Sequence, residues 1–563
     1  MTDPYASKPW LKSYDKHVPE HLTYPDKLYT DMFHEAVEQV RDRVAIYYAG
    51  RPVTYGELDT MANQFANFLI GQGLKQGDVV GINLPNVLAN YISMIGILKA
   101  GCVVSGVSPL LTQRELEFQL NNSGAKVLVT MDMLWSNVSP VVGKTGVKTV
   151  VMVRVTDFLP PAKKMLGKLL KKIPDIKVTP VAGIPMHNYM DILKTSPAAA
   201  PLLKMSNDAN CMLQYTGGTT GLPKGAIITH KNFVSMMTQL TTWIDCKMGK
   251  DTMLLAFPLF HMAGMAFTLY GLSRGNTMIA VPNPRDYASF IKSLIKYKPT
   301  MMLNVATIYM ELLKIPAFSK IDFSNLSWCF TGAMALPPEC FRQLEALVGE
   351  GKVIEGLGMT ETSPLIIMGP VVGKKKIGSV GLPVSDTEIK VIDPLTGELM
   401  PLGEPGELVA KGPQVFTKGY HNMPEETAET LRDGWIYTGD VVRMDEEGYF
   451  FVVDRYKDMV NVSGFKVFTR ELDDLILEHP DVSLVATVGT PNPDRPGAEI
   501  VTTAIVLKPG VEKSDAEKNS IIEFVKQRAA PYKVPKKIVF MDQLPLSSVG
   551  KILKRELREM LKT

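Results

Sequence analysis

Strand-like and helix-like hydrophobic patterns alternate along most of the chain. Val79 to Leu84 is a short and largely apolar run that predicts a buried strand, and Val87 to Ala100 follows it with the length of a helix. Ala125 to Thr130 predicts another buried strand. Apolar strands separated by helices are typical of parallel sheets that are covered on both faces. The pattern therefore predicts an α/β fold with layered, mostly parallel sheets and helices.

The pattern changes towards the C-terminal end. Gly448 to Val453 predicts a strand, the polar run Asp454 to Asp458 follows it, and a smaller α+β pattern begins after that run. Such a polar run between two patterned regions is typical of a domain boundary. We therefore expect a large domain over residues 1–453 and a small, mobile α+β domain over residues 460–563, joined at residues 454–459.

Length and charge limit the kinds of partner. The chain has 563 residues, more than one compact core usually holds, so several domains or subdomains are expected. Lys and Arg total 61 against 58 Asp and Glu, which leaves little net charge. The balance gives no bulk affinity for nucleic acid. The sequence leaves the oligomeric state open, with a homodimer as one candidate.

The cysteines indicate a reducing compartment. They are odd in number, scattered, and without Cys-x-x-Cys spacing, which supports neither a disulfide framework nor a zinc site. The segment Met1 to Lys8 lacks the apolar core of a signal peptide, so a cytoplasmic location is expected. The five cysteines are Cys102, Cys211, Cys246, Cys329 and Cys340.

One apolar stretch is long enough to suggest a membrane span. Thr252 to Ser273 carries no Asp, Glu, Lys or Arg, but Pro258, His261 and Gly264 interrupt it. We interpret it as a strand, a loop and a buried helix. Its end, Gly271 to Gly275, matches the hydrolase nucleophile elbow, yet a helix precedes it and a strand follows, the reverse of that motif, so Ser273 is expected to be a turn residue.

A run rich in glycine and threonine is the strongest chemical signal. Glycines let the backbone approach a polyphosphate closely, hydroxyl groups can bind oxygen or a metal, and lysine adds positive charge. Apolar residues on both sides predict a loop between two strands, and a Walker A loop would instead have Gly-Lys-Ser/Thr before a helix. We interpret the run as an ATP loop: Tyr215-Thr216-Gly217-Gly218-Thr219-Thr220-Gly221-Leu222-Pro223-Lys224-Gly225.

Further short motifs follow in a recognisable order. With the glycine-rich run they resemble the adenylate-forming enzymes, which comprise acyl-CoA synthetases, amino-acid adenylation domains and luciferases. Length and the insertion near residue 162 are most similar to bacterial long-chain fatty acid:CoA ligases, and the resemblance covers nearly the whole chain. The motifs are Pro258-Leu259-Phe260-His261, Gly358-Met359-Thr360-Glu361-Thr362, Tyr437-Thr438-Gly439-Asp440, Asp454-Arg455-Tyr456-Lys457-Asp458 and Gly550-Lys551.

The resemblance implies a two-step ligase reaction. A carboxylate is a poor electrophile, so the family first joins it to AMP from ATP, releasing pyrophosphate, and then transfers the acyl group to CoA. ATP, Mg²⁺ and CoA are therefore expected, with a medium- or long-chain fatty acid as substrate. An aryl-acid CoA ligase and a fatty acyl-AMP ligase that delivers to a carrier protein remain alternatives. Outside catalysis, an adenylate-binding or membrane-docking protein would keep the fold.

The resemblance also assigns roles to single residues. Lys551 would bridge the attacking carboxylate and the α-phosphate, and Thr216 and Glu361 would hold the metal. Asp440 and Arg455 would contact the ribose. Each has an ordinary alternative, a solvated lysine, a helix cap or a surface salt bridge. The other expected nucleotide contacts are Gly217, Gly218, Thr219, Thr220, Gly221, Lys224, Gly332, Ala333, Gly358, Met359 and Thr360.

By the same resemblance, Asp454 is the hinge about which the small domain turns after adenylation. The rotation would remove Lys551 and bring up a second face that includes the catalytic Lys457. The CoA route on that face is expected to include Gly464, Phe465 and Lys466.

The acid site is expected after the second motif. His261 matches an aromatic position at the head of the acyl pocket, where it would position and polarise the substrate rather than act as an obligatory base. Met262, Gly264 and Met265 would line the pocket, or belong to an ordinary core. Leu357 stands where the family usually presents an aromatic ring to adenine, so an aliphatic contact replaces stacking.

A basic amphipathic segment interrupts the α/β pattern. In Ala162 to Ile173 apolar residues recur at helical spacing opposite lysines, which predicts either an interfacial helix on the inner membrane face or a docked surface helix.

Overall fold

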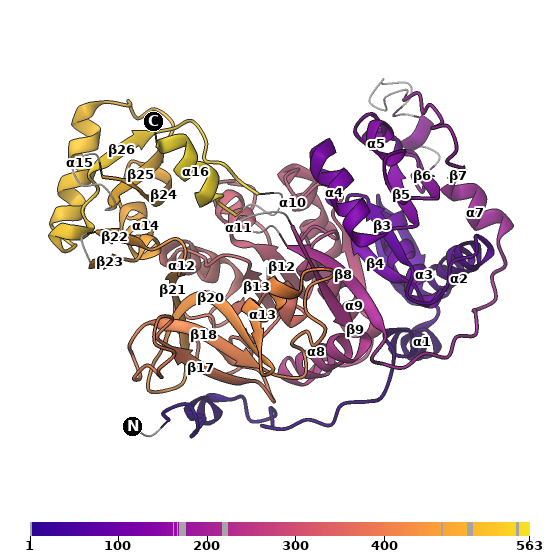
Figure 1. Ribbon diagram of the computed structural model, residues 1–563, viewed down its shortest axis with the longest axis horizontal. Coiled ribbons are helices and arrows are strands. Elements are labelled where there is room, and N and C mark those ends of the chain that lie inside the picture. Colours follow the sequence, from indigo (N-terminus) through magenta and orange to yellow (C-terminus); the bar gives the residue numbers. More distant parts are fainter. Residues whose placement is uncertain are drawn as a thin grey trace.

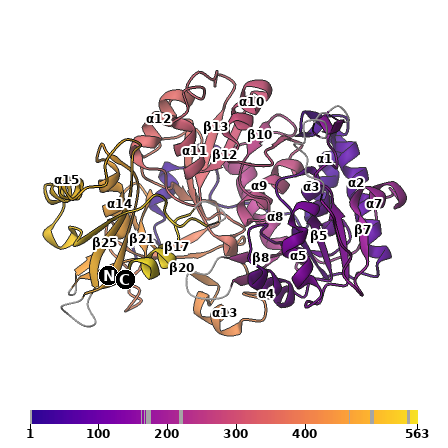
Figure 2. The ribbon, with the colours of Figure 1, turned by 90° about the horizontal axis from the view of Figure 1, so that it is seen from above.

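The computed structural model describes residues 3–160, 163–165, 167, 176–216, 223–462, 465–492, 499–547 and 551–562. The described residues form two large sheets, a smaller antiparallel sheet and a C-terminal part. In both views the first sheet lies at one end of the molecule, the C-terminal part lies at the other, and the second sheet lies between them (Figures 1 and 2).

The first sheet has the strand order β7-β6-β5-β3-β4-β8-β9 and is parallel except at the β8–β9 pair. Expected strands and helices appear within a few residues of their predicted bounds. The strands are β3 (Val79–Asn83), β4 (Val103–Gly106), β5 (Val127–Met131), β6 (Thr149–Val153), β7 (Met186–Asn188), β8 (Asn210–Thr216) and β9 (Lys224–Thr229), and the helices are α2 (Tyr55–Gly71), α3 (Leu88–Lys99), α4 (Gln113–Ser123), α5 (Trp135–Val142) and α7 (Tyr189–Thr195).

Helix α2 shows how the sequence sets these boundaries. Thr54 precedes it, and its hydroxyl accepts a hydrogen bond from Glu57 N at 3.2 Å. The Glu57 carboxylate in turn accepts from Thr54 N at 2.8 Å. This reciprocal pair satisfies two backbone donors at the helix start. Every residue of the neighbouring helix α3 is buried, so α3 is a central helix of the domain.

The second sheet has the order β16-β15-β14-β13-β12-β10-β11-β1-β2, with a parallel centre and antiparallel pairs at both ends. Its strands are β1 (Val44–Tyr48), β2 (Arg51–Thr54), β10 (Thr252–Leu255), β11 (Thr277–Ala280), β12 (Met301–Val305), β13 (Trp328–Gly332), β14 (Val353–Leu357), β15 (Ile367–Met368) and β16 (Leu382–Pro383), and the helices near it are α1 (Tyr29–Val40), α8 (His230–Trp243), α9 (Met262–Ser273), α10 (Tyr287–Tyr297), α11 (Ala306–Leu313) and α12 (Pro338–Val348). The layered, mostly parallel α/β fold is confirmed.

The stretch Thr252 to Ser273 forms β10, a loop and the buried helix α9, as predicted. No helix among the described residues is long and apolar enough to cross a bilayer. The expectation for Ser273 is wrong in detail, because this buried residue ends helix α9 and its hydroxyl donates to Tyr270 O at 2.7 Å. All five cysteines are described and free.

The antiparallel sheet follows, built from β17 (Glu388–Ile392), β18 (Gly406–Lys411), β19 (Leu431–Arg432), β20 (Trp435–Met444) and β21 (Phe450–Arg455), with the short helix α13 (Pro424–Thr430) beside it. The N-terminal segment, residues 3–28, runs along the lower edge of the large domain in Figure 1 and includes the 3₁₀ helix η1 (Pro9–Ser13). It bonds to backbone carbonyls far along the chain: Tyr5 Oη donates to Met400 O at 2.9 Å, Ser13 Oγ to Glu447 O at 2.8 Å and Tyr14 Oη to Pro383 O at 2.6 Å.

The C-terminal part has its own buried apolar clusters. One includes Val467, Ile476 and Val485, and another includes Val488 and Leu557. Its strands are β22 (Val460–Val462), β23 (Phe465–Val467), β24 (Val482–Pro491), β25 (Glu499–Leu507) and β26 (Lys537–Phe540), and its helices are α14 (Thr469–Leu477), α15 (Asp515–Lys526) and α16 (Lys554–Leu561).

Candidate active site

The strands around the glycine-rich run are antiparallel neighbours. Thr216 ends β8 directly opposite Lys224, which starts β9. The Lys224 ammonium group lies 5.3 Å from the centroid of the Tyr420 ring. The two strands predicted on either side of the run are therefore present, and Gly217, Gly218, Thr219, Thr220 and Gly221 lie outside the described residues.

Glu361 is a buried carboxylate on the short 3₁₀ helix η3 (Thr360–Thr362). The Tyr420 hydroxyl donates to its Oε1, while its Oε2 is buried without a hydrogen-bond partner among the described residues. Burial raises the pKa of the Glu361 carboxyl, and the Tyr420 hydrogen bond and the charges of Arg455 and Lys224 lower it. One oxygen is thus fixed by the protein and the other is left for a ligand.

The turn before Glu361 requires glycine at position 358. A Cβ at Gly358 would lie 1.8 Å from the carbonyl oxygen of Pro364, far inside van der Waals contact. Met359 and the buried Thr360 follow it. The close backbone approach brings η3 against the segment after it, and so places Glu361.

Asp440 and Arg455 form an ion pair at the edge of the antiparallel sheet. They are directly opposite each other on β20 and β21, and Arg455 Nε lies 3.0 Å from Asp440 Oδ1. Asp440 is buried, whereas the Arg455 side chain is 46% exposed. The second carboxylate oxygen of Asp440 is not used by this pair, so the pair can present an acceptor and a donor side by side.

Lys551 reaches this group from the C-terminal part. Its backbone N–H donates to Ser547 Oγ at 3.0 Å and its carbonyl accepts from Ser547 N at 2.7 Å. Burial and then the charge of Arg455 lower the pKa of the Lys551 ammonium group to about 8, against the opposing effects of Asp440 and Glu361. The structure therefore brings together four predicted site residues from two separate parts of the chain.

His261 lies beside the same group, at the start of α9. Its Nδ1 accepts from Ala263 N at 3.3 Å, so the neutral ring carries its proton on Nε2. Burial and the nearby charge of Lys551 lower the pKa of His261 to about 3. The ring is therefore neutral near pH 7 and can donate a hydrogen bond, but it is a poor general base.

The residues after His261 are buried and apolar. Met262 and Met265 are buried on α9, and Gln214 Nε2 lies 2.9 Å from the Met265 sulfur. A Cβ at Gly264 would lie 2.0 Å from Pro258 O, so glycine lets α9 fold tightly against the turn that carries His261. The surroundings suit an apolar ligand or an ordinary core equally well.

The turn after β13 holds an unusual backbone. Gly332 ends the strand, and Ala333 has φ of 68°, in the left-handed region that costs a non-glycine residue energy. Leu357 ends the neighbouring strand β14. Strained backbone of this kind is concentrated at functional sites.

Lys457 and Lys466, which were predicted on the face of the C-terminal part that serves CoA, are not bonded to the group around Glu361 and Lys551 within the part of the chain that the structure describes. The Lys457 side chain is exposed, and the described residues include no hydrogen bond or ion pair from its ammonium group to Glu361, Asp440 or Lys551. Lys466 is exposed on β23, Phe465 starts that strand, and Gly464 lies outside the described residues.

Two residues of this region were not predicted. The Tyr420 hydroxyl donates a hydrogen bond to Glu361, but no pattern in the sequence around Tyr420 predicts that contact. Glu355 is a single charge within the apolar strand β14, which is a detectable signal. Its Oε2 accepts from Leu336 N at 3.2 Å, its Oε1 has no partner among the described residues, and burial raises the pKa of its carboxyl to about 7.

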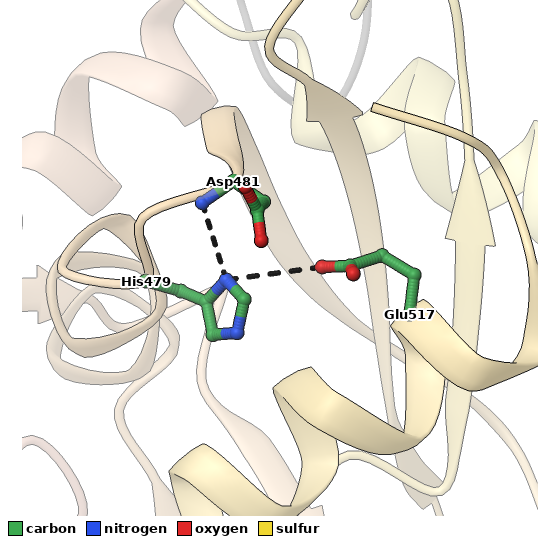
Figure 3. Close-up of side chains that lie close together, drawn as sticks. All are labelled: His479, Asp481 and Glu517. Atoms are coloured by element: carbon green, nitrogen blue, oxygen red, sulfur yellow. Dashed lines mark hydrogen bonds and ion pairs between the residues drawn. The ribbon is translucent and has the colours of Figure 1, made fainter. Parts of the chain in front are cut away.

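A separate group of potential metal ligands lies in the C-terminal part. His479, Asp481 and Glu517 approach one another (Figure 3), with His479 Nδ1 3.8 Å from Glu517 Oε1. The same Nδ1 accepts from Asp481 N at 3.3 Å. Because an N–H points at this lone pair, the cluster closes the turn before β24 and is not arranged around a cation.

Known proteins match along the whole chain. A family model described as AMP-binding enzyme matches residues 33–421, and one described as AMP-binding enzyme C-terminal domain matches residues 471–551. The long-chain-fatty-acid--CoA ligase of Bacillus subtilis (strain 168) is 37% identical over 560 residues, which cover 98% of each protein.

Solved structures agree with this match. The anthranilate CoA ligase AuaEII in complex with anthranoyl-AMP has a TM-score of 0.83 at 25% identity, covering 96% of this chain and 98% of that one. ATP-bound MatB from Rhodopseudomonas palustris has a TM-score of 0.82 at 27% identity, covering 95% of this chain and 99% of that one.

Proposed function

Because the chain belongs to the AMP-binding enzyme family, we propose that it is an ATP-dependent, AMP-forming acid:CoA ligase that activates a medium- or long-chain fatty acid through acyl-AMP. The observation that carries this proposal is that the buried Lys551 ammonium group lies near enough to Arg455, Asp440 and Glu361 for their charges to act on its pKa, with Arg455 Nε and Asp440 Oδ1 paired at 3.0 Å. A cation supplied by the C-terminal part faces a buried carboxylate and an acceptor–donor pair, which suits a charged nucleotide whose phosphate must react.

The first step joins the acid to AMP. A carboxylate oxygen attacks the α-phosphorus of ATP, a C–O–P bond forms, and the bond to the bridging oxygen breaks as pyrophosphate leaves. Lys551 would neutralise charge on the attacking carboxylate and the α-phosphate, and Lys224 would face the phosphates beside the glycine-rich run. The Asp440 carboxylate would accept from the ribose hydroxyls, with Arg455 as neighbouring donor.

The donor set also fits Mg²⁺. Glu361 Oε2 is a buried oxygen without a partner among the described residues, and Thr216 ends β8 at the glycine-rich run. Magnesium prefers such oxygen ligands together with phosphate and water. We propose that Thr216 and Glu361 hold it, where it would neutralise phosphate charge.

The second step moves the acyl group to CoA. The CoA thiol releases its proton to water, its sulfur attacks the acyl carbon, and AMP leaves with the electron pair of the broken C–O bond. We propose a hinge at residues 454–459, with rotation about Asp454, that withdraws Lys551 after step one. Lys457 and the route Gly464, Phe465 and Lys466 would then serve the thiol.

The acid would lie with its carboxylate at His261 and its chain against α9. A neutral Nε2–H can orient a carboxylate oxygen without trapping it as a buried ion pair would. Met262, Gly264 and Met265 supply apolar, deformable surroundings for a hydrocarbon chain. The family relatives named for long-chain fatty acids support the same substrate class.

An aryl-acid CoA ligase is the second candidate, because the similar AuaEII structure is an anthranilate CoA ligase. The deciding experiment is steady-state thioester formation with ATP, magnesium and CoA across acids from acetate to oleate, with benzoate alongside. A maximal rate with an acid of ten carbons or more supports the fatty acid hypothesis. A higher rate with benzoate supports the aryl-acid hypothesis instead. Adenylate without thioester indicates a carrier-protein acceptor instead.

Contact with a membrane surface extends the proposal. Only part of the predicted Ala162 to Ile173 segment is described, and there Met165 is 72% exposed and directly follows the exposed Lys163 and Lys164. Cations beside an exposed apolar side chain suit an anionic bilayer surface. Sedimentation with anionic vesicles, compared with zwitterionic ones, tests it, and equal recovery from both rejects the electrostatic part.

A further inference from the structure

A chain of buried polar groups joins the proposed hinge to the helix that follows Lys551. Asp454 is 5% exposed and Thr469, the first residue of α14, is fully buried. The Thr469 backbone N–H donates to Asp454 Oδ2, and the Thr469 hydroxyl donates to the same oxygen at 2.9 Å. Lys554, the first residue of α16, then donates from Nζ to Thr469 Oγ1 at 2.8 Å and to Asp473 Oδ2 at 2.9 Å.

The hydrogen bonds of this chain run in one direction. Lys554 donates a hydrogen bond to the Thr469 hydroxyl oxygen, and that hydroxyl donates a hydrogen bond to Asp454. A positive charge on the donor side and a negative charge on the acceptor side strengthen both bonds, and such charge-assisted bonds are stronger than neutral ones. Burial adds to this, since the Lys554 and Asp473 side chains are only 15% and 12% exposed. The arrangement therefore strongly favours one relative position of its members.

The contact between Asp454 and Thr469 depends on the backbone angle of Asp454. The carboxylate is attached to the Asp454 Cα, at the end of β21, whereas Thr469 belongs to the C-terminal part that follows. Rotation about the Cα–C bond of Asp454 would carry Thr469 away from the carboxylate. Both Thr469 hydrogen bonds to Asp454 would then break, while the bonds from Lys554 to Thr469 and Asp473 would move with the C-terminal part.

The far end of the chain of bonds lies close to Lys551. Lys554 starts α16 three positions after Lys551, and the intervening Ile552 pairs with Leu546 across the loop. Leu553 N also donates to Pro545 O at 2.9 Å. A displacement of the α16 start is therefore transmitted through a short, bonded stretch of backbone.

We propose that Asp454, Thr469, Lys554 and Asp473 form a latch that holds the C-terminal part with Lys551 at the nucleotide site, so that Thr469 and Lys554 are positioning residues for the adenylation step. The effect of the latch on the two half-reactions rests on the proposed function. Its effect on the position of the C-terminal part does not depend on that function. While it is closed the enzyme is set for acyl-AMP formation, and breaking it releases the C-terminal part for thioester formation.

The sharpest test is Thr469→Val, which keeps the shape of the side chain and the backbone N–H but removes the hydroxyl. We expect acyl-AMP formation, measured by pyrophosphate release without CoA, to fall about tenfold, the effect of one charge-assisted hydrogen bond. Thioester formation from supplied acyl-AMP and CoA should stay at the wild-type rate or rise. Thr469→Ser restores the hydroxyl and should recover adenylation.

A matched ion pair on the same helix provides the control. Lys533 Nζ bonds to Glu471 on α14 at 2.7 Å, and both residues lie outside the hinge. Lys533→Met should leave both half-reactions unchanged, while Lys554→Met should lower adenylation more than Thr469→Val does. Because Lys554→Met leaves Asp473 buried without its cation, its melting temperature is measured alongside, and Thr469→Val remains decisive if Lys554→Met does not fold.

Trypsin cleavage at the hinge tests the latch without any chemistry. Arg455 and Lys457 lie in the proposed hinge, and a closed latch should protect the bonds after them. Thr469→Val should be cut several times faster there than the wild type or Lys533→Met, as measured by mass spectrometry of timed digests. Unchanged cleavage, or an equal loss of both half-reactions, overturns the latch. A wild type that forms no acyl-AMP from any acid overturns the proposed function, and the cleavage result still decides on the latch.

Discussion

Glu361 and Lys551 carry opposite charges towards one site, yet the molecule holds them in different ways. Glu361 is 3% exposed on η3 in the large domain, and the Tyr420 hydroxyl fixes one of its oxygens. Lys551 comes from the C-terminal part on a short loop, and the backbone bonds to Ser547 hold it. The first group is built into the layered core, and the second is delivered to it.

The difference indicates a division of labour. Groups that must recognise the same nucleotide throughout the reaction benefit from a fixed position, since preorganised groups need no rearrangement when charge develops. A group needed in only one step can lie on a part that moves away. Each prediction below either removes one side of this contrast or measures how far it extends.

Removal of the Lys551 ammonium group should have the largest effect on acyl-AMP formation. Lys551→Ala should lower acyl-AMP formation by about 10³-fold, because it removes a cation from the reacting phosphate. Thioester formation from supplied acyl-AMP should be nearly unchanged. Separate assays of the two half-reactions check this, and an equal loss in both would show that Lys551 is not confined to one step.

Removal of the Glu361 carboxylate should lower acyl-AMP formation, but the two half-reactions should differ less than they do in Lys551→Ala. Glu361→Ala should lower acyl-AMP formation by about 10²-fold and raise the magnesium concentration needed for half-maximal rate, because a ligand oxygen is lost. Tyr420→Phe should give a smaller loss in the same direction, since Glu361 stays but is less firmly held. A magnesium titration of each variant gives the answer, and an unaltered magnesium requirement in Glu361→Ala would remove the metal role.

The pKa of Lys551 predicts a pH dependence confined to the first step. With a pKa near 8, the ammonium group is charged below pH 8 and loses its proton above it, whereas an ordinary lysine stays charged until about pH 10. The kcat/KM of adenylation should therefore fall up to tenfold per pH unit above pH 8. The second half-reaction, followed over the same range, should lack this limb. If both half-reactions fall together, another group is titrating.

The smallest expected effect concerns adenine. Leu357→Tyr would place a ring where the wild type has an aliphatic side chain, and ring stacking is worth roughly 1 kcal/mol. The KM for ATP should fall by about fivefold with kcat little changed. Leu357→Met serves as the control of similar volume, and an equal change in both variants would argue against stacking.

The alternating strands and helices were predictable because the hydrophobic pattern of each lies within its own segment. The bounds of β3, α3 and β5 follow from runs of apolar residues and differ from the structure by a few positions. The meeting of Glu361 with Lys551 followed only from resemblance, since no local pattern links residues so far apart. Tyr420 was missed for the same reason.

Other details depended on context that a local motif does not contain. Ser273 was expected in a turn because its nucleophile-elbow match stands in reversed context, but α9 continues to that residue, where its hydroxyl donates to Tyr270 O within the helix. The network around Thr469 and Lys554 was also not foreseen, although both residues lie in the predicted small α+β domain. Side-chain contacts between elements arise from packing, which periodicity describes only through buried and exposed faces.

The N-terminal segment has a consequence for the order of events during synthesis. Tyr5, Ser13 and Tyr14 bond to backbone carbonyls that lie 369 to 434 positions later. At rates of about 5–20 residues per second, the ribosome needs roughly twenty to ninety seconds to go from Ser13 to Glu447, the last of these partners. Until each partner has been made, the hydrogen bond to it cannot form. The contacts between the N-terminal segment and the rest of the large domain are thus completed only after Glu447 has been synthesised.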